Sequence, residues 1–120
     1  MNKRNIILIG MPGAGKSSVG VILAKVLGYE FIDTDLVIQH REKRLLREII
    51  ADEGNEGFLA IENEVNATLE ADKSVIAPGG SAIYGKEAME HFKEIGTIVY
   101  LKLSYEDCLL YTSDAADEAR

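Results

Sequence analysis

Residues 6–18 read IILIGMPGAGKSS, an apolar run that breaks into a glycine-rich loop and passes directly into a helical pattern. Gly10, Gly15, Lys16 and Ser17 fit the spacing G-x-x-x-x-G-K-[ST] of a phosphate-binding loop. Glycines allow the backbone to curl with its N–H groups directed inward, close enough to reach phosphate oxygens. The stretch therefore predicts a nucleotide-binding loop between a buried strand and a helix.

The residues expected to bind ATP lie in this loop and at the start of the helix, where unpaired N–H groups and the helix dipole attract an anion. They are Gly13, Ala14, Gly15, Lys16, Ser17 and Ser18. Lys16 brings a mobile charge to the β- and γ-phosphates, so we also expect it to be catalytic. The Ser17 hydroxyl is expected to be a ligand for Mg²⁺.

The hydrophobic pattern of the rest of the chain alternates between strands and helices. Apolar runs predict strands at 6–9, 29–32, 74–77 and 97–103. Helical spacing predicts helices over 19–27, over 36–50 with a break near 40–44, and over 58–69 and 85–95, with a further break at 54–57. This alternation predicts the α/β class, an open parallel sheet with helices on both faces, whose ligands collect at the carboxyl ends of strands.

Two of the predicted helices carry an apolar stripe that should face the core. In the first helix the stripe comprises Val19, Ile22, Leu23, Val26 and Leu27. In the third it comprises Phe58, Ile61, Val65 and Leu69, and the polar residues Glu62, Glu64 and Asn66 are expected to lie off it.

Acidic or glycine residues follow two of the strands. Asp33 ends the strand that contains Phe31 and Ile32, and it is the candidate ligand for Mg²⁺ or its waters; its alternative role is to cap the next helix. Asp35 is the candidate catalytic residue that orients an attacking hydroxyl, or else it merely favours the helix start. Gly79 and Gly80 follow the third strand and are candidates to contact a small polyol, or else form an ordinary turn.

Composition restricts the class of partner. At 120 residues we expect one domain, and the net charge of −7 argues against nucleic acid or an anionic membrane surface. The single cysteine cannot form an internal disulfide, and two histidines without a cysteine cluster argue against zinc. The first apolar run is too short for a signal peptide or a membrane span. We therefore expect a cytoplasmic monomer that acts on a small molecule.

Four motifs in register, GMPGAGKSS, FIDTD, EGxxxFxxxE ending at Glu62, and PGGS, resemble the shikimate kinase family over residues 5–103. The resemblance implies a nucleoside-monophosphate-kinase-like sheet and transfer of the γ-phosphoryl group of ATP to shikimate, giving shikimate 3-phosphate in aromatic amino-acid biosynthesis. It also implies that residues 13–18 bind the ATP phosphates and that Ser17 and Asp33 bind Mg²⁺ or its waters. Three further residues are implied to hold the hydroxyl groups of the substrate. These three are Asp35, Gly79 and Gly80.

The chain departs from the family pattern at two positions. Leu59 stands where the family has an arginine that binds the substrate carboxylate, and Ser81 stands where it has a third glycine. Leucine cannot make the bidentate contact of an arginine. Candidates to replace that arginine are Arg41, Arg44 and Arg47. Because of Leu59, a related kinase with a different acceptor stays open as an alternative. A second alternative is a nucleotide-binding fragment without turnover, because we expect the family's lid and final strand to be missing from this chain.

The end of the chain differs in character from the rest. Residues 108–118 read CLLYTSDAADE and resemble one reading frame of a transposase adaptor used in sequencing libraries. We expect a kinase domain over residues 1–107 and a non-native tail over 108–120, with the family's lid, adenine-contacting segment and last strand missing. The alternative is a genuine acidic C-terminal helix.

Overall fold

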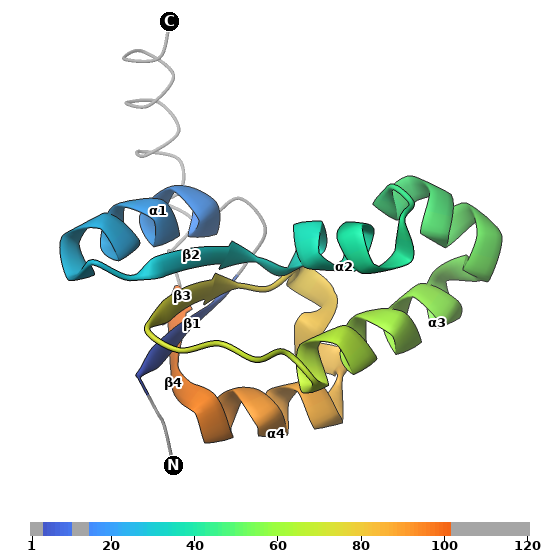
Figure 1. The fold of residues 1–120 in the computed structure, drawn as a ribbon. Coiled ribbons are helices and arrows are strands. Elements are labelled where there is room, and N and C mark those ends of the chain that lie inside the picture. The colour runs from blue at the N-terminus through green and yellow to red at the C-terminus, as the bar shows by residue number, and fades with distance from the viewer. Residues whose placement is uncertain (1–3, 11–14, 102–120) are drawn as a thin grey trace, which may run out of the picture.

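The computed structural model describes residues 4–10 and 15–101 (Figure 1). Some expectations concern residues that the structure does not describe. They are those for Gly13 and Ala14, for the last two residues of the strand predicted at 97–103, and for the C-terminal tail. They stay predictions, and reading the genomic DNA beyond codon 107 tests the one about the tail.

Helices and strands follow the predicted order. They are β1 (Asn5–Gly10), α1 (Lys16–Leu27), β2 (Glu30–Asp33), α2 (Thr34–Glu42), α3 (Leu46–Ala67), β3 (Ser74–Ala77), the 3₁₀ helix η1 (Gly80–Tyr84), α4 (Lys86–Ile95) and β4 (Gly96–Leu101). Each predicted strand and helix within the described residues is present, with ends that differ by a few residues. None of the helices between residues 15 and 101 is long and apolar enough to cross a membrane.

The strands form one parallel sheet in the order β2-β3-β1-β4. Side chains of β1 alternate between its two faces, because successive strand residues point in opposite directions. Leu8 packs with Ala24 of α1, whereas Ile7 packs with Phe92 of α4. Helices therefore cover both faces, with α1 and α4 on opposite sides (Figure 1). The predicted open parallel α/β sheet is confirmed.

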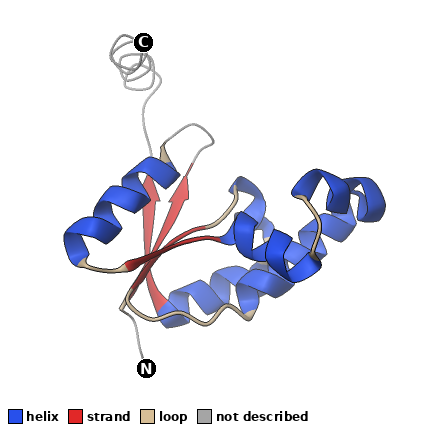
Figure 2. Ribbon diagram, turned by 45° about the horizontal axis from the view of Figure 1, so that its top comes forward, coloured by secondary structure: helices blue, strands red, loops and turns tan. Residues whose placement is uncertain are grey.

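Helices α2 and α3 form an arm that reaches away from the sheet (Figure 2). Its own core contains Ile38 of α2 with Ile49 and Val65 of α3. The predicted break within α3 lies at Gly54, whose φ of 77° and ψ of 173° depart from helical geometry. Residues 55–57 remain helical, so the break is a single-residue kink and not the expected four-residue loop. After the kink, α3 returns toward the sheet and packs against α4 and η1.

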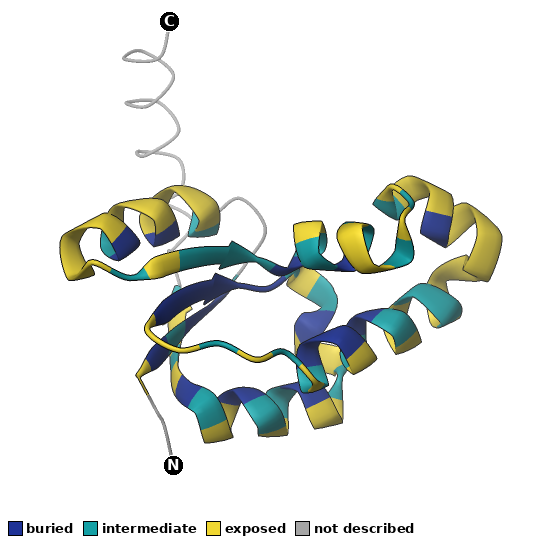
Figure 3. Cartoon of the chain, in the orientation of Figure 1, coloured by how far each residue is buried: buried dark blue, intermediate teal, exposed yellow. Residues whose placement is uncertain are grey.

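The prediction that a stripe of large apolar residues on α1 faces the core is wrong for four of its five members. Leu23 is half-buried and packs against the core as predicted, whereas Val19, Ile22, Val26 and Leu27 are exposed. Val26 is 77% exposed and Ile22 is 63% exposed, and Figure 3 shows the outer side of α1 as exposed. The buried residues of α1 are Gly20 and Ala24. A Cβ on Gly20 would lie 2.5 Å from Phe31 Cε1 and 3.3 Å from Leu8 Cδ1. At Gly20 the helix therefore lies too close to Phe31 and Leu8 for a side chain to fit without a shift of its neighbours.

The expectation that polar residues of α3 lie off its buried face is also wrong for two of them. Glu62 is 2% exposed and Asn66 is fully buried, whereas Glu64 is exposed as expected. The side chains of Phe58, Ile61, Val65 and Leu69 are buried or half-buried. Glu62 follows Phe58 by four residues and precedes Val65 by three, so it shares their face of the helix.

Candidate functional site

The loop after β1 leads into the amino end of α1. Gly15, with a φ of 77°, precedes the helix and provides no side-chain cap for it. The first N–H groups of α1 therefore lack the usual capping partner and can meet an anion. Lys16 Nζ donates a hydrogen bond to the carbonyl oxygen of Gly10 at 2.9 Å. The lysine thus reaches back from α1 to β1, and its charge lies at the carboxyl end of that strand.

A cavity of about 360 Å³ lies beside this helix start and the ends of β2 and β3. It is lined by Gly15, Lys16, Ser17, Ser18, Asp33, Asp35, Ala77, Pro78, Gly79 and Gly80. Every candidate site residue within the described part of the chain lines this cavity. The roles of these residues in binding and catalysis stay predictions.

The two aspartates occupy the turn from β2 into α2. Asp33 is the last residue of β2, and its Oδ1 accepts a hydrogen bond from the Asp35 backbone N–H at 2.9 Å. Asp33 therefore does cap α2, the alternative raised from the sequence. Because the cap uses one carboxylate oxygen, capping is compatible with a metal contact through Oδ2. Asp35 follows two residues later and is half-buried.

A third carboxylate, from Glu62 of α3, meets Asp35 over Gly79. A Cβ on Gly79 would lie 2.9 Å from Asp35 Oδ1 and 3.1 Å from Glu62 Oε2. Only glycine leaves this space open. The sequence analysis missed Glu62 as a site residue, although its spacing from Phe58 and Val65 placed it on the buried face of α3.

Both carboxylates of this pair ionise less readily than exposed ones. Burial raises the pKa of Asp35, the charge of Asp33 raises it further, and Lys16 opposes both effects. Burial also raises the pKa of Glu62, with a smaller contribution of the same sign from Asp35, whereas the hydrogen bond from Ser81 lowers it. Desolvation and like charge thus both act against a doubly ionised pair.

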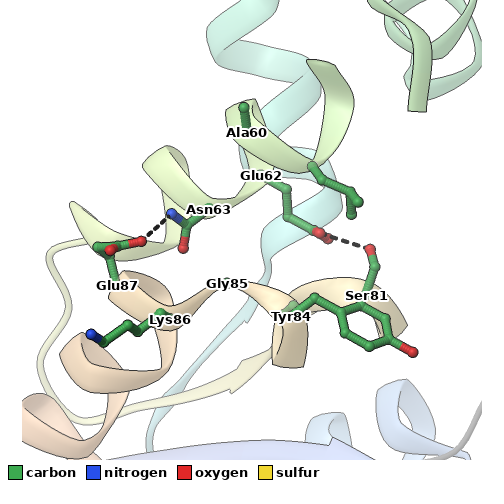
Figure 4. Close-up of a pocket in the computed structure, with 10 residues that line it drawn as sticks. Ala60, Glu62, Asn63, Ser81, Tyr84, Gly85, Lys86 and Glu87 are labelled. Carbon is green, nitrogen blue, oxygen red and sulfur yellow. Dashed lines mark hydrogen bonds between the residues drawn. The ribbon is translucent and has the colours of Figure 1, made fainter. Parts of the chain in front are cut away.

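A second cavity, of about 280 Å³, lies between α3 and η1 (Figure 4). Glu62 lines this cavity, and its Oε1 accepts a hydrogen bond from Ser81 Oγ at 2.7 Å. Its Oε2 lies near Gly79, a residue of the first cavity. Asn63 joins α3 to α4, because its Nδ2 donates to Glu87 and its Oδ1 accepts from the Ala88 N–H, each at 2.9 Å. Leu59 also lines this cavity.

The three arginines considered as replacements for a carboxylate-binding arginine do not line either of these two cavities. Arg41 forms ion pairs with Glu64 and Glu42. Arg44 forms ion pairs with Glu42, Asp52 and Glu53. Arg47 is exposed on α3. Within the described residues, nothing indicates that any of these three arginines takes over the role of the family arginine that Leu59 replaces.

The donor set suits Mg²⁺ that arrives with a nucleotide. Among residues 4–10 and 15–101, no group of three or more His, Cys, Asp or Glu side chains could hold a metal ion. Mg²⁺ in nucleotide sites takes only one or two ligands from the protein and the others from phosphates and water. Ser17 and Asp33 line the same cavity and can provide such a pair of oxygens.

A family model and several curated relatives and solved structures match this chain. The family model described as shikimate kinase matches residues 12–120. A shikimate kinase of Trichormus variabilis is 42% identical over 97% of this chain, and a shikimate kinase 2 of Yersinia enterocolitica is 39% identical over 84% of it. The solved structure of shikimate kinase from Acinetobacter baumannii in complex with shikimate superposes with a TM-score of 0.77, at 36% identity over 97% of this chain. The chain spans 63%, 58% and 64% of the lengths of these three proteins, respectively.

Proposed function

This chain belongs to the shikimate kinase family, and we propose that the complete protein transfers the γ-phosphoryl group of ATP to a hydroxyl group of shikimate, giving shikimate 3-phosphate. The observation that carries the proposal is the single cavity that Lys16 and Ser17 line together with Asp35 and Gly79. A phosphate donor and a hydroxyl acceptor can therefore meet in one space. The similar structure from Acinetobacter baumannii contains shikimate.

Catalysis in this site rests on positioning and charge. Lys16 and the amino end of α1 hold the phosphates and offset the negative charge that develops during transfer. Asp35 accepts a hydrogen bond from the attacking hydroxyl and receives its proton as the new phosphorus–oxygen bond forms and the bond from the γ-phosphorus to the departing ADP breaks. The raised pKa of Asp35 brings it nearer to the working pH and makes it a better proton acceptor. Gly79 leaves room for the acceptor beside this carboxylate.

Three finer statements belong to the same proposal. Mg²⁺ would be held by Ser17 and Asp33, and when bound it supplies charge neutralisation for the phosphates. The protein acts as a monomer in the cytoplasm, without nucleic-acid or membrane partners. Gly13, Ala14 and Ser18 would contribute to ATP binding with Gly15 and Lys16, and Gly80 to acceptor binding with Gly79.

An assay of ADP release by the complete protein tests the proposal. We expect turnover with ATP and shikimate and a decrease in kcat of about 10²- to 10⁴-fold for Asp35→Asn, because that variant cannot accept the proton. Asp52→Asn is the matched control, since Asp52 is an exposed acid of α3 that pairs with Arg44. Equal turnover by the Asp35→Asn variant would remove Asp35 from its role.

A related kinase with another acceptor is the second candidate, and Leu59 is the observation that favours it. This leucine lines the cavity next to Glu62 and brings no positive charge to it. Assaying shikimate beside other hydroxy acids and sugar acids separates the two candidates. Faster turnover with a different acceptor would assign the protein to the related activity. Binding of ATP in calorimetry without turnover on any acceptor would instead support the alternative of a nucleotide-binding fragment.

A further inference from the structure

Ser81 makes a contact that its position does not require. It is the second residue of η1, a helix whose start carries no side-chain cap. A serine near a helix start commonly bonds to the neighbouring backbone. Here its hydroxyl instead donates across to α3, to Glu62 Oε1 at 2.7 Å (Figure 4). The hydroxyl thus fixes one oxygen of a carboxylate that is otherwise buried.

This contact determines where the other oxygen of Glu62 lies. Oε2 is directed to the space above Gly79, where a Cβ would lie 3.1 Å from it and 2.9 Å from Asp35 Oδ1. Two acceptor oxygens, from α2 and from α3, therefore border the same opening at the end of β3. An acceptor molecule with neighbouring hydroxyl groups could donate to both of them.

We propose that Ser81 is a positioning residue for the phosphoryl acceptor, because its hydroxyl holds Glu62 so that Oε2, together with Asp35, receives hydroxyl groups of the bound acceptor. This inference rests on the proposed function. Without the hydroxyl of Ser81, the Glu62 carboxylate can rotate away from Gly79 and no longer presents Oε2 beside Asp35. Ser81 itself does not touch the reacting atoms.

The groups around Glu62 show why this hydrogen bond matters for its charge. Asp35 of α2 faces Glu62 across Gly79, and its negative charge opposes ionisation of Glu62. Lys86 and Glu87 of α4 line the adjacent cavity and carry opposite charges. The hydrogen bond from Ser81 favours the ionised, hydrogen-bond-accepting form of Glu62. Its removal should raise the pKa of Glu62.

The test compares Ser81→Ala with the unchanged complete protein, with Ser81→Thr as the conservative variant and Ser74→Ala as the matched control. Ser74 also donates one side-chain hydrogen bond, to the Asp72 carbonyl at 3.1 Å, but it lies at the opposite end of β3. In Ser81→Ala we expect KM for shikimate to rise about tenfold, the effect of one lost hydrogen bond to a charged group. KM for ATP should be unchanged. Ser81→Thr should restore most of the loss, and Ser74→Ala should change neither KM.

A titration that does not depend on activity completes the test. Carbon-13 NMR of labelled glutamate carboxyl groups, with Glu62 assigned through Glu62→Gln, should show a higher pKa for Glu62 in Ser81→Ala. An unchanged pKa, or an active protein whose acceptor KM is unaffected by Ser81→Ala, overturns the inference and leaves the proposed function intact. A protein that shows the pKa change but phosphorylates no hydroxy acid contradicts the proposed function, and the role of Ser81 with it.

Discussion

At the scale of single residues, the candidate site brings the ammonium group of Lys16 near carboxylates whose ionisation is opposed by burial and by like charge. Lys16 Nζ donates a hydrogen bond to the carbonyl oxygen of Gly10. Asp35 and Glu62 each place a carboxylate oxygen next to Gly79. Burying two acids side by side destabilises the fold when both are ionised. Such an arrangement is typical of functional sites, where groups are held for chemistry at some expense of stability.

Replacement of Lys16 should impair transfer without unfolding the protein. We expect Lys16→Met to lower kcat about 10²- to 10³-fold, the usual effect of removing one preorganised group that stabilises charge in the transition state. Steady-state kinetics measure this loss, and circular dichroism controls for folding. Lys25→Met is the control variant, because Lys25 is an exposed residue of the last turn of α1. A kcat unchanged by Lys16→Met would contradict the placement of the phosphates.

The raised pKa of Glu62 predicts how stability depends on pH. The proton of Glu62 stabilises the folded state below the pKa of the unfolded chain, and this stabilisation is lost as pH rises through the raised pKa of the folded state. Glu62→Gln keeps an acceptor for Ser81 and cannot ionise. It should therefore melt at a higher temperature than the unchanged protein near pH 7, and at a similar temperature near pH 4.

Scanning calorimetry at both pH values checks this prediction. Glu56→Gln, which changes an exposed acid of the same helix, should give no comparable increase in melting temperature near pH 7. A stabilisation by Glu62→Gln that is equally large at both pH values would show that it does not arise from ionisation.

At the scale of helices and strands, the sequence predicted the elements well and their buried faces less well. The strand ends predicted the positions of Asp33, Asp35, Gly79 and Gly80, because the carboxyl ends of parallel strands share one edge of a sheet. The buried face of α1 was predicted from its large apolar side chains. That face instead contains Gly20 and Ala24, because the helix lies close to the sheet, and this distance cannot be read from the sequence of the helix alone. Glu62 was missed because a polar residue on an apolar stripe was assigned to the exposed side.

The close packing of α1 predicts a specific cost for a single added methyl group. Gly20→Ala places a Cβ 2.5 Å from Phe31 Cε1 and should destabilise the protein by about 1–3 kcal/mol, the usual range for overpacking. The double variant with Phe31→Leu should recover part of this loss. Urea unfolding measures both values. A loss in the double variant equal to the sum of the two single losses would contradict a direct contact.

At the scale of the whole molecule, the site lies where two bodies of the fold meet. The sheet with α1 carries Lys16 and Ser17, which we propose hold the phosphates and Mg²⁺. The arm of α2 and α3 carries Asp35 and Glu62, and it has a core of its own. We therefore expect substitutions in the core of the arm to change the affinity for the acceptor more than the affinity for ATP.

Two matched core substitutions test that division. Ile49 lies in the core of the arm and Ile7 in the core of the sheet, and both are fully buried. Replacing either with valine should destabilise the protein by about 0.5–1.5 kcal/mol. Ile49→Val should raise KM for the acceptor more than KM for ATP, because it loosens the arm, whereas Ile7→Val should not. Equal effects of the two substitutions on acceptor KM would contradict the division.

The central claim is that a phosphoryl group passes, within one cavity, from the Lys16 side to a hydroxyl held beside Asp35. The most direct measurement follows the γ-phosphorus of isotopically labelled ATP in the complete protein with shikimate present. The account predicts that the label appears in shikimate 3-phosphate and that little ADP forms when shikimate is omitted. Label that appears as inorganic phosphate at the same rate with and without shikimate would contradict it.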